Sequence, residues 1–445
     1  MHHTGNVRQA DVVIAGSGPG GATVAREMAK AGKKVILCEK GAYHRGCGLT
    51  LSMLSYFSKF GFTFSKEGAW VLRPQTVGGA TSIFMGTAFM PPPWLKDKYG
   101  IDVTAECTEF WNEVPIKPLS DRLMQEPALR IMDAARTMGI DWQPLNKMMR
   151  HDKCVPGCAK CSSMCPIPGA RWSAREYVEE AWANGAELLL KTDVKKVLTE
   201  NGKAVGVVAV GPDGNEMHIM ADTVVISAGG QGTPPIMQRS GIYDAGKGFF
   251  ADPLWLVWAP TSRTGTNHCV PMSGGVNYSE DGFVLTDIGA AFLFWAGTML
   301  FKWPFGALEI PKALANWNNM YVIMIKCRDS LEGMANIDES FSKPIDYKVQ
   351  WQLNKATAIS TEILVRTGCK PKDISNTCIV AAHPGGTMRI GNLLDKDCQS
   401  PIKNCYCMDT SIIPEPWGLP PVVTLVGMAK RLSKKLLGVG AKKEK

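Results

Sequence analysis

The segment between residues 11 and 41 constrains the fold of this chain most, because it has the pattern of a strand, a glycine turn, a helix, a second strand and an acid. The first strand is a β-branched run at residues 12–14, and the second is an apolar run at residues 35–37. The turn between them has the GxGxxG spacing, set by Gly16, Gly18 and Gly21. We expect the first glycine to permit the tight turn, the second to let the backbone approach a pyrophosphate, and the third to let the helix pack close to the strand.

The helix of this unit is predicted over Ala22 to Lys30, with Gly32 at its end. Its N-terminus would present free N–H groups and the positive end of the helix dipole to phosphates. Glu39 closes the second strand about 20 residues after the glycines, where a carboxylate accepts the hydroxyls of a ribose. An acid at this position favours adenosine without a 2′-phosphate, so the segment predicts FAD or NAD rather than NADP.

The composition excludes several other classes of protein. The chain has 445 residues, which is long enough for two domains. Its content of 45% hydrophobic and 20% charged residues is typical of a soluble globular protein. The net charge of +8 is modest, and no basic stripe interleaved with aromatic residues indicates nucleic-acid binding. The first residues lack the apolar core of a signal peptide. With 14 cysteines, we therefore expect a reducing, cytoplasmic location and thiols or metal ligands rather than disulfides.

The segment from Ile288 to Phe301 is almost entirely apolar. It is shorter than the roughly 20 residues that a membrane-spanning helix needs. We expect it to form a buried helix that lines a hydrophobic substrate cavity. The alternative is a patch that contacts a membrane without spanning it and takes up substrate there.

Four pieces of the sequence occur in an order that resembles one enzyme family. They are the N-terminal glycine unit, the Gly78-Gly79 turn, the segment VVISAGGQGTPPIMQRSGI, and the C-terminal run HPGGTMRIG…MDTSIIP…PPVVTLVGMAKRL. Together they resemble the glucose–methanol–choline (GMC) oxidoreductases, which are FAD enzymes that oxidise alcohols, and within these the long-chain-alcohol and sterol oxidase branch. The resemblance implies an α/β fold: a discontinuous Rossmann-like FAD-binding domain and an α+β substrate domain with an antiparallel sheet. We place the FAD-binding domain at 1–90, 170–242 and 374–445, the substrate domain at 91–150 and 243–373, and a cysteine-rich loop at 151–169.

The resemblance also implies roles for particular residues. His383, which begins HPGGTMRIG, would be the active-site histidine near the flavin, where an imidazole can take the proton of an alcohol as hydride leaves the carbon. The expected cofactor contacts are spread over all four pieces and the predicted strand TDVKKV at residues 192–197. They are Gly16, Gly18, Gly21, Glu39, Lys40, Gly78, Gly79, Thr81, Val194, Ala228, Gly229, Asp409 and Pro421.

Two departures from the family pattern bear on the reaction. The family places an Asn or His before its last helix, as the partner of the catalytic histidine, whereas this chain has Pro420 and Pro421 there. Proline has no side-chain donor and no N–H, so one hydrogen bond to a substrate oxygen is missing. The usual Asn of the glycine turn falls at about Phe84. We expect Glu415 or Trp417 to act as the substitute catalytic group, or else a different reaction.

The run CVPGCAKCSSMCP carries Cys154, Cys158, Cys161 and Cys165 with the spacing C-x3-C-x2-C-x3-C-P. It differs by one residue in the first gap from the bacterial ferredoxin run, and four thiolates within a dozen residues can hold a [4Fe–4S] cluster. A structural zinc or free thiols are the alternatives. Three later cysteines, Cys398, Cys405 and Cys407, match no common ligand spacing, so we expect them to pack in a core.

These features predict an FAD-dependent oxidoreductase that acts on a hydrophobic alcohol or a related carbon centre. An iron–sulfur cluster would pass single electrons to a redox protein or partner subunit. The first alternative is a flavin-dependent reductase or desaturase of an apolar C–C bond. The second is a non-catalytic electron-transfer subunit of a larger complex that has kept the fold and the cofactors.

Overall fold

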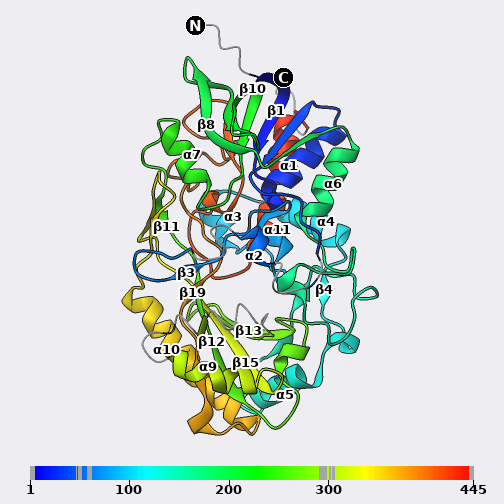
Figure 1. The fold of residues 1–445 in the computed structure, drawn as a ribbon, viewed down its shortest axis with the longest axis vertical. Helices are drawn as coiled ribbons and strands as arrows, with labels where there is room; N and C mark the ends of the chain where they lie inside the picture. The colour runs from blue at the N-terminus through cyan, green and yellow to red at the C-terminus, as the bar shows by residue number, and fades with distance from the viewer. Residues whose placement is uncertain are drawn as a thin grey trace.

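The computed structural model describes residues 6–46, 48, 53–57, 63–289, 298–299, 302 and 306–439. Within these residues the chain forms two large sheets and two small ones. In Figure 1 the sheet that contains β1 and β10 lies at the top, and the sheet that contains β12 and β15 lies at the bottom. The mixed α/β fold predicted from the sequence is confirmed.

The upper sheet has seven strands in the described chain, in the order β7-β2-β1-β10-β9-β8, with β20 paired to β10. The strands β7, β2, β1, β10 and β20 pair with one another in parallel, whereas β9 is antiparallel to both of its neighbours, β10 and β8. Their bounds are β1 Asn6–Ala15, β2 Val35–Glu39, β7 Glu187–Leu190, β8 Asp193–Glu200, β9 Lys203–Val210, β10 Glu216–Ile226 and β20 Cys405–Cys407.

The predicted βαβ unit forms, with one change at the start of the helix. β1 and β2 pair in parallel, with Val12 opposite Val35, and the second half of β1 is fully buried. The helix α1 spans Pro19–Lys30 and so begins three residues before the predicted Ala22. Pro19 suits the first helical position because its fixed φ is helical and its missing N–H would have had no partner there.

The helices on this sheet pack against each other as well as against the strands. α1 contacts α6 and α11, and α11 contacts α4, while α7 packs on β8. Their bounds are α4 Thr104–Glu113, α6 Ala174–Ala183, α7 Thr233–Arg239 and α11 Val422–Leu436. Ser173 precedes α6 but makes no side-chain capping bond, and the Glu176 carboxylate in the first turn accepts from Arg150.

The lower sheet has eight strands in the described chain, in the order β3-β19-β12-β15-β14-β13-β5, with β18 paired to β12. It is antiparallel apart from the pairing of β19 with β3. The bounds are β3 Trp70–Val71, β5 Gln143–Pro144, β12 Pro253–Pro260, β13 Gly274–Tyr278, β14 Phe283–Asp287, β15 Met320–Cys327, β18 Ser375–Asn376 and β19 Val380–Ala381.

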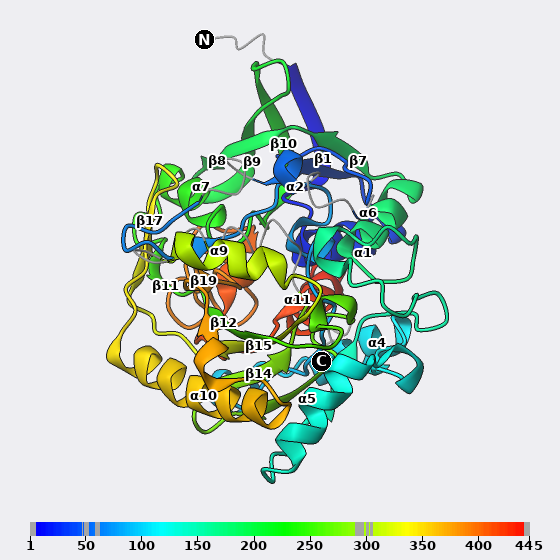
Figure 2. The same ribbon diagram turned by 60° about the horizontal axis from the view of Figure 1, so that its bottom comes forward.

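One face of the lower sheet is covered by α10 (Tyr347–Arg366), which runs beneath β12, β14 and β15 in Figure 2. Because side chains alternate along a strand, Ile323 and Ile325 of β15 pack in the core on the α10 side, and Val322 and Met324 lie on the other face. That second face is the one that turns toward the glycine turn.

Smaller elements complete the described chain. They are α2 Met53–Tyr56, α3 Trp94–Tyr99, α5 Glu126–Arg136, α9 Gly306–Ala315, β4 Lys117–Pro118, β6 Asn146–Lys147, β11 Lys247–Phe249, β16 Gly333–Ala335 and β17 Phe341–Ser342. Short 3-10 helices occur at Gly79–Ser82, Asp121–Leu123, Cys161–Ser163, Thr266–His268, Pro371–Asp373 and Thr410–Ile412.

The predicted apolar helix at residues 288–301 lies mostly outside the described residues. Its first residue, Ile288, is buried in the core on the inner face of the lower sheet. Over the described ranges, no helix is both long enough and apolar enough to cross a membrane.

Candidate active site

A cavity of about 400 Å³ lies between the two sheets. Its walls come from the glycine turn after β1, the end of β2, the turn at Gly79–Phe84, the loop after β10, the inner face of β12 and β15, the segment at Val380–Pro384, and the start of α11. Segments from both ends of the chain and from its middle therefore meet at one site.

The glycine turn has the geometry that its spacing predicts. Gly16 has a φ of +103°, and a Cβ there would lie 2.1 Å from the Ser227 carbonyl oxygen, so no larger residue fits. A Cβ on Gly21 would lie 2.1 Å from the carbonyl oxygen of Gly16, which explains how the helix packs so close to the strand. Gly18 differs, because nothing lies within 4 Å of its Cβ position. Gly18 lines the cavity, so a Cβ there would point into open space rather than against the protein.

Glu39 lies at the end of β2, and its carboxylate is buried beside the glycine turn. Its Oε2 accepts from the Ser17 N–H at 3.1 Å, and its Oε1 accepts from the Gly41 N–H at 2.7 Å. Burial raises the pKa of this carboxyl, although the hydrogen bonds oppose the shift. Oε2 also accepts from the Ser17 hydroxyl, whereas Oε1 accepts only the Gly41 bond and retains a lone pair, so the carboxylate, which lines the cavity, can still accept from a ribose hydroxyl through Oε1.

Two other predicted contacts lie at the same end of the cavity. Val194, on β8, is buried and lines the wall. Lys40 also lines the cavity, and its ammonium is held by the carboxylates of Glu339 at 3.1 Å and Asp193 at 3.3 Å.

The second glycine turn packs directly onto the first. A Cβ on Gly79 would lie 3.1 Å from the Gly18 Cα, and the Gly78 N–H donates to the Ser17 hydroxyl at 3.2 Å. The Thr81 hydroxyl donates to the Gly78 carbonyl and accepts from the Ala174 N–H at 2.9 Å, which ties the turn to α6. The side chain of Thr81 thus holds the turn in place at the cavity wall.

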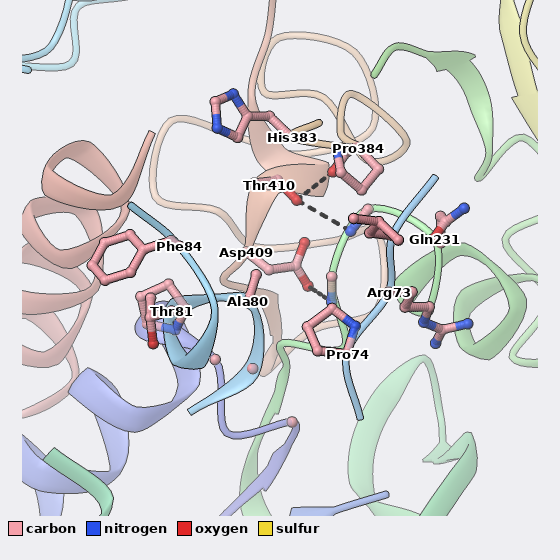
Figure 3. Close-up of a pocket in the computed structure, with 18 of the residues that line it drawn as sticks. Arg73, Pro74, Ala80, Thr81, Phe84, Gln231, His383, Pro384, Asp409 and Thr410 are labelled. Carbon is pink, nitrogen blue, oxygen red and sulfur yellow. Dashed lines mark hydrogen bonds between the residues drawn. The ribbon is translucent and has the colours of Figure 1, made fainter. Parts of the chain in front are cut away.

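Phe84, at the position where the resemblance led us to expect an Asn, lines the cavity as well (Figure 3). The buried Arg171 guanidinium lies 4.7 Å from the centre of its ring and donates to the carbonyl oxygens of Thr81 and Ser82, each at 2.7 Å. Arg171 therefore fixes both the ring and the turn that carries it.

Asp409 joins the loop after β10 to the C-terminal segment. Its Oδ2 accepts from the Gly229 N–H at 2.9 Å and from the Thr233 hydroxyl, and its Oδ1 accepts from the Ser411 N–H at 2.7 Å (Figure 3). Burial raises the pKa of this carboxyl. Asp409 and the adjacent Ala228 line the cavity, but the acid's visible role is to hold two loops together.

His383 follows β19 and lines the cavity with a quarter of its side chain accessible. Its Nδ1 lies 3.0 Å from the Lys326 ammonium and 3.3 Å from Oδ2 of Asp252. Burial, followed by the charge of Lys326, holds the pKa of this imidazole well below its ordinary value. His383 is therefore a neutral base or donor at neutral pH.

Glu415 and Trp417, which were expected to replace the missing partner of the catalytic histidine, lie outside the cavity lining. The Glu415 carboxylate accepts from Lys98 and from the Tyr99 hydroxyl at 2.7 Å. The Trp417 ring lies tilted against that of Trp94, and its Nε1 donates to a backbone carbonyl. Neither lines the cavity, so the structure gives no support to their prediction as catalytic residues. Their side chains contact α3 instead.

Lys326 contacts the His383 ring, as a partner residue would, but it was not predicted from the sequence. The signal that could have found it is a single charge at the end of the otherwise apolar strand MYVIMIKC. Pro420 and Pro421 do line the cavity, and Pro421 precedes the first turn of α11, whose N-terminus opens at the site.

The part of the cavity near His383 has an apolar wall. The wall is formed by side chains from the inner face of the lower sheet and its adjoining loops, namely Leu254, Leu256, Met272, Ile288 and Met324. Polar groups line the cavity beside this wall, among them Lys326, His383 and Thr87, and the combination suits a substrate with a long apolar part and a polar end.

The predicted metal site is not supported. All four cysteines of the loop at 151–169 lie in the described part of the chain, and no group of three or more His, Cys, Asp or Glu that could hold a metal is found there. Burial raises the pKa of the Cys161 thiol to about 12, which disfavours a thiolate in this state. Cys398, Cys405 and Cys407 are buried beside β10, in keeping with their expected packing role.

The cradle fits the ADP part of a dinucleotide such as FAD. Glycines 16 and 18, the buried Glu39 and Val194 would hold that part, while the Gly79–Thr81 turn, Ala228, Gly229 and the start of α11 adjoin the end that carries His383. No side chain crosses the glycine turn at Gly18 to fill the space that a pyrophosphate would need.

Comparison with known proteins places this geometry in a family. An uncharacterised GMC-type oxidoreductase of Mycobacterium tuberculosis is 27% identical over 53% of this chain, and the match spans only 40% of that protein. The long-chain-alcohol oxidase FAO3 of Arabidopsis thaliana is 23% identical over 96% of this chain and 67% of its own length. The crystal structure of pyridoxine 4-oxidase from Mesorbium loti has the same fold, with a TM-score of 0.67, 14% identity, and coverage of 96% of this chain and 99% of the other.

The family model for GMC oxidoreductases matches residues 10–254. This match contains the glycine unit, both glycine turns and the loop after β10, and it covers more than half of the chain. The protein therefore belongs to the GMC oxidoreductase family.

Proposed function

We propose that this chain is an FAD-dependent oxidoreductase that oxidises a hydrophobic alcohol. The observation that carries the proposal is a single cavity that joins the dinucleotide cradle, a neutral histidine and an apolar wall. The Arabidopsis relatives named as long-chain-alcohol oxidases support the same substrate class.

In this proposal the bound FAD supplies the acceptor for a hydride from the alcohol carbon. The protein binds the alkyl part of the substrate against Leu254, Leu256 and Met324, which removes apolar surface from water. His383 then lies at the polar end, where its imidazole takes the hydroxyl proton. The low pKa of His383 keeps the ring neutral at neutral pH, so one of its two nitrogens carries no hydrogen, as a base requires; which nitrogen that is depends on the tautomer.

The test is anaerobic reduction of the purified, FAD-loaded protein by primary alcohols of increasing chain length, followed by the flavin absorbance. We expect reduction that becomes faster as the chain lengthens. Replacing His383 with Asn should retain FAD and slow reduction by a factor of about 10² to 10⁴, because a positioned base contributes that much. Re-oxidation of the reduced flavin by an enone, with no reduction by any alcohol, would favour the reductase alternative.

The electron acceptor is a separate proposal. The cysteine loop adjoins the cavity through Ser162, and two of its cysteines, Cys154 and Cys161, are buried. This position favours electron transfer through a cluster to a protein acceptor, with a rearrangement of the loop to bring the thiols together. Iron and acid-labile sulfide analysis of anaerobically purified protein tests it: their absence would leave oxygen or a directly bound flavoprotein as the acceptor.

A further inference from the structure

Three neighbouring strands of the lower sheet bring two charged residues close to Nδ1 of the His383 imidazole. Asp252 immediately precedes β12, His383 lies two residues after β19, and Lys326 lies on β15 opposite Leu254 of β12. The pairing of β12 with β19, with Pro253 opposite Ala381, brings the backbones of Asp252 and His383 together. The register of this sheet therefore fixes the three side chains relative to each other.

The group is buried, and its backbone is strained. The side chain of Lys326 is 4% exposed and that of Asp252 is 2% exposed. Asp252 and His383 have φ values of +40° and +57°, a region that residues with a Cβ rarely adopt. Such strain persists only where the surroundings impose it, and it is concentrated at functional sites. Oδ1 of Asp252 also has no hydrogen-bond partner among the described residues, although it is buried.

A single nitrogen of His383 faces both charged groups. Lys326 Nζ is 3.0 Å from Nδ1, and Asp252 Oδ2 is 3.3 Å from the same atom, while the two charged groups are 3.9 Å apart. An Nδ1 that accepts from an ammonium cannot also donate to a carboxylate. The protonation of Lys326 therefore decides which nitrogen of the neutral ring carries the hydrogen.

We propose that Lys326 and Asp252 form a proton relay behind His383, in which Lys326 is a positioning residue that sets the tautomer of the ring. The proposal rests on the function proposed above. With Lys326 as a neutral amine, Nδ1–H points at Lys326 and Asp252, and Nε2 is free to take the alcohol proton. As Nε2 gains that proton, the Nδ1 proton passes to Lys326 Nζ, which becomes an ammonium beside the Asp252 carboxylate. One proton enters and one leaves the ring, so the imidazole ends neutral.

The relay predicts a dependence on pH whose sign follows from the geometry. Burial lowers the pKa of Lys326 to about 8, although Asp252 opposes the shift, and burial raises the pKa of Asp252 to about 7. Below about pH 8, Lys326 is an ammonium that donates to Nδ1, so the hydrogen sits on Nε2 and the base is blocked. Activity should therefore rise with pH through about 8. Arg328, Cys327, Asp329 and its partner Lys343 are the other titratable or charged groups near the pair, and every variant below retains them.

Two substitutions at Lys326 make opposite predictions. Lys326→Arg keeps a permanent charge and should hold the hydrogen on Nε2 at every pH, which removes the rise in activity. Lys326→Met has no charge and should hold the hydrogen on Nδ1 at every pH. Its kcat should vary little with pH and be about tenfold below the parent at pH 9, because the relay has lost its acceptor. A purely structural role for Lys326 would lower activity in both variants without altering the pH profile.

The direct measurement is ¹⁵N NMR of the histidine rings in the FAD-loaded protein, with His383→Asn used to assign one of the seven histidines. We expect the His383 ring to change tautomer near pH 8 in the parent and to stay in opposite tautomers in the two variants. A tautomer that does not respond to pH in the parent, or is the same in both variants, would overturn the proposal. Because the NMR experiment needs no substrate, it tests this inference separately from the proposed function. A tautomer that depends on Lys326, in a protein that oxidises no alcohol, would refute the proposed function and leave this inference standing. Asp252→Asn provides a second variant if Lys326→Met does not fold, and it should shift the tautomer change to lower pH, because it removes the carboxylate that favours the ammonium.

Discussion

The two glycines on either side of the first turn of α1 allow a sharp test of the dinucleotide cradle. A Cβ on Gly21 would lie 2.1 Å from the Gly16 carbonyl oxygen and 3.0 Å from the Ser227 side chain. A Cβ on Gly18 meets nothing within 4 Å, and the φ of −63° at Gly18 is ordinary for alanine. The same added methyl group therefore collides with the protein at Gly21 and with a ligand at Gly18.

The expected magnitudes follow from these distances. In Gly21→Ala the helix would have to move by about 0.9 Å to restore a separation of 3.0 Å, below which real Cβ atoms are essentially never found. Overpacking of this kind typically costs about 1–3 kcal/mol of unfolding free energy. In Gly18→Ala the apo-protein should be as stable as the parent, or more stable by about 0.4–1 kcal/mol, because alanine restricts the unfolded chain.

FAD affinity separates the two variants. A methyl group in the space next to the pyrophosphate should weaken binding by at least about tenfold in Gly18→Ala, or about 1.4 kcal/mol. The assay is denaturant unfolding of the apo-protein together with titration of FAD by fluorescence quenching. Parent-like FAD binding in Gly18→Ala would refute the assignment of this space to the cofactor, and parent-like stability in Gly21→Ala would refute the packing argument.

Two further predictions concern stability and substrate choice. Lys343→Met should cost about 3–5 kcal/mol in denaturant unfolding at pH 7, because it leaves the fully buried Asp329 carboxylate without its partner at 3.1 Å. Burial raises the pKa of Asp329 to about 6, so protonation at lower pH removes that unpaired charge. The loss of unfolding free energy in Lys343→Met should therefore be smaller at pH 5 than at pH 7, and a loss that does not depend on pH would contradict this account. Met324→Trp adds bulk to the apolar wall and should raise KM for long-chain alcohols about tenfold, while KM for short-chain alcohols stays nearly unchanged. An equal effect on alcohols of all chain lengths would mean that the alkyl chain binds elsewhere.

The parts of this protein that could be predicted from its sequence are those that depend on residues near each other in the chain. The βαβ unit was predictable because its strands, glycines and acid lie within 30 residues and each has a local backbone or packing reason. The antiparallel hairpin of β9 and β10 was predictable for the same reason, since Asp213 and Gly214 form the turn that joins its strands. The resemblance to a family added His383, whose motif is also short.

The side chains that surround His383, by contrast, are brought together by the three-dimensional fold. Lys326 and Asp252 are separated from His383 by 57 and 131 positions, and no local pattern relates them. Glu415 and Trp417 are much closer to α11 in sequence, yet their side chains turn to α3. The physical reason is that the register of β19, β12 and β15 places residues opposite each other through backbone hydrogen bonds, which carry no information about side-chain identity. A sequence read without that register therefore specifies the cofactor cradle but not the groups that set the proton chemistry beside it.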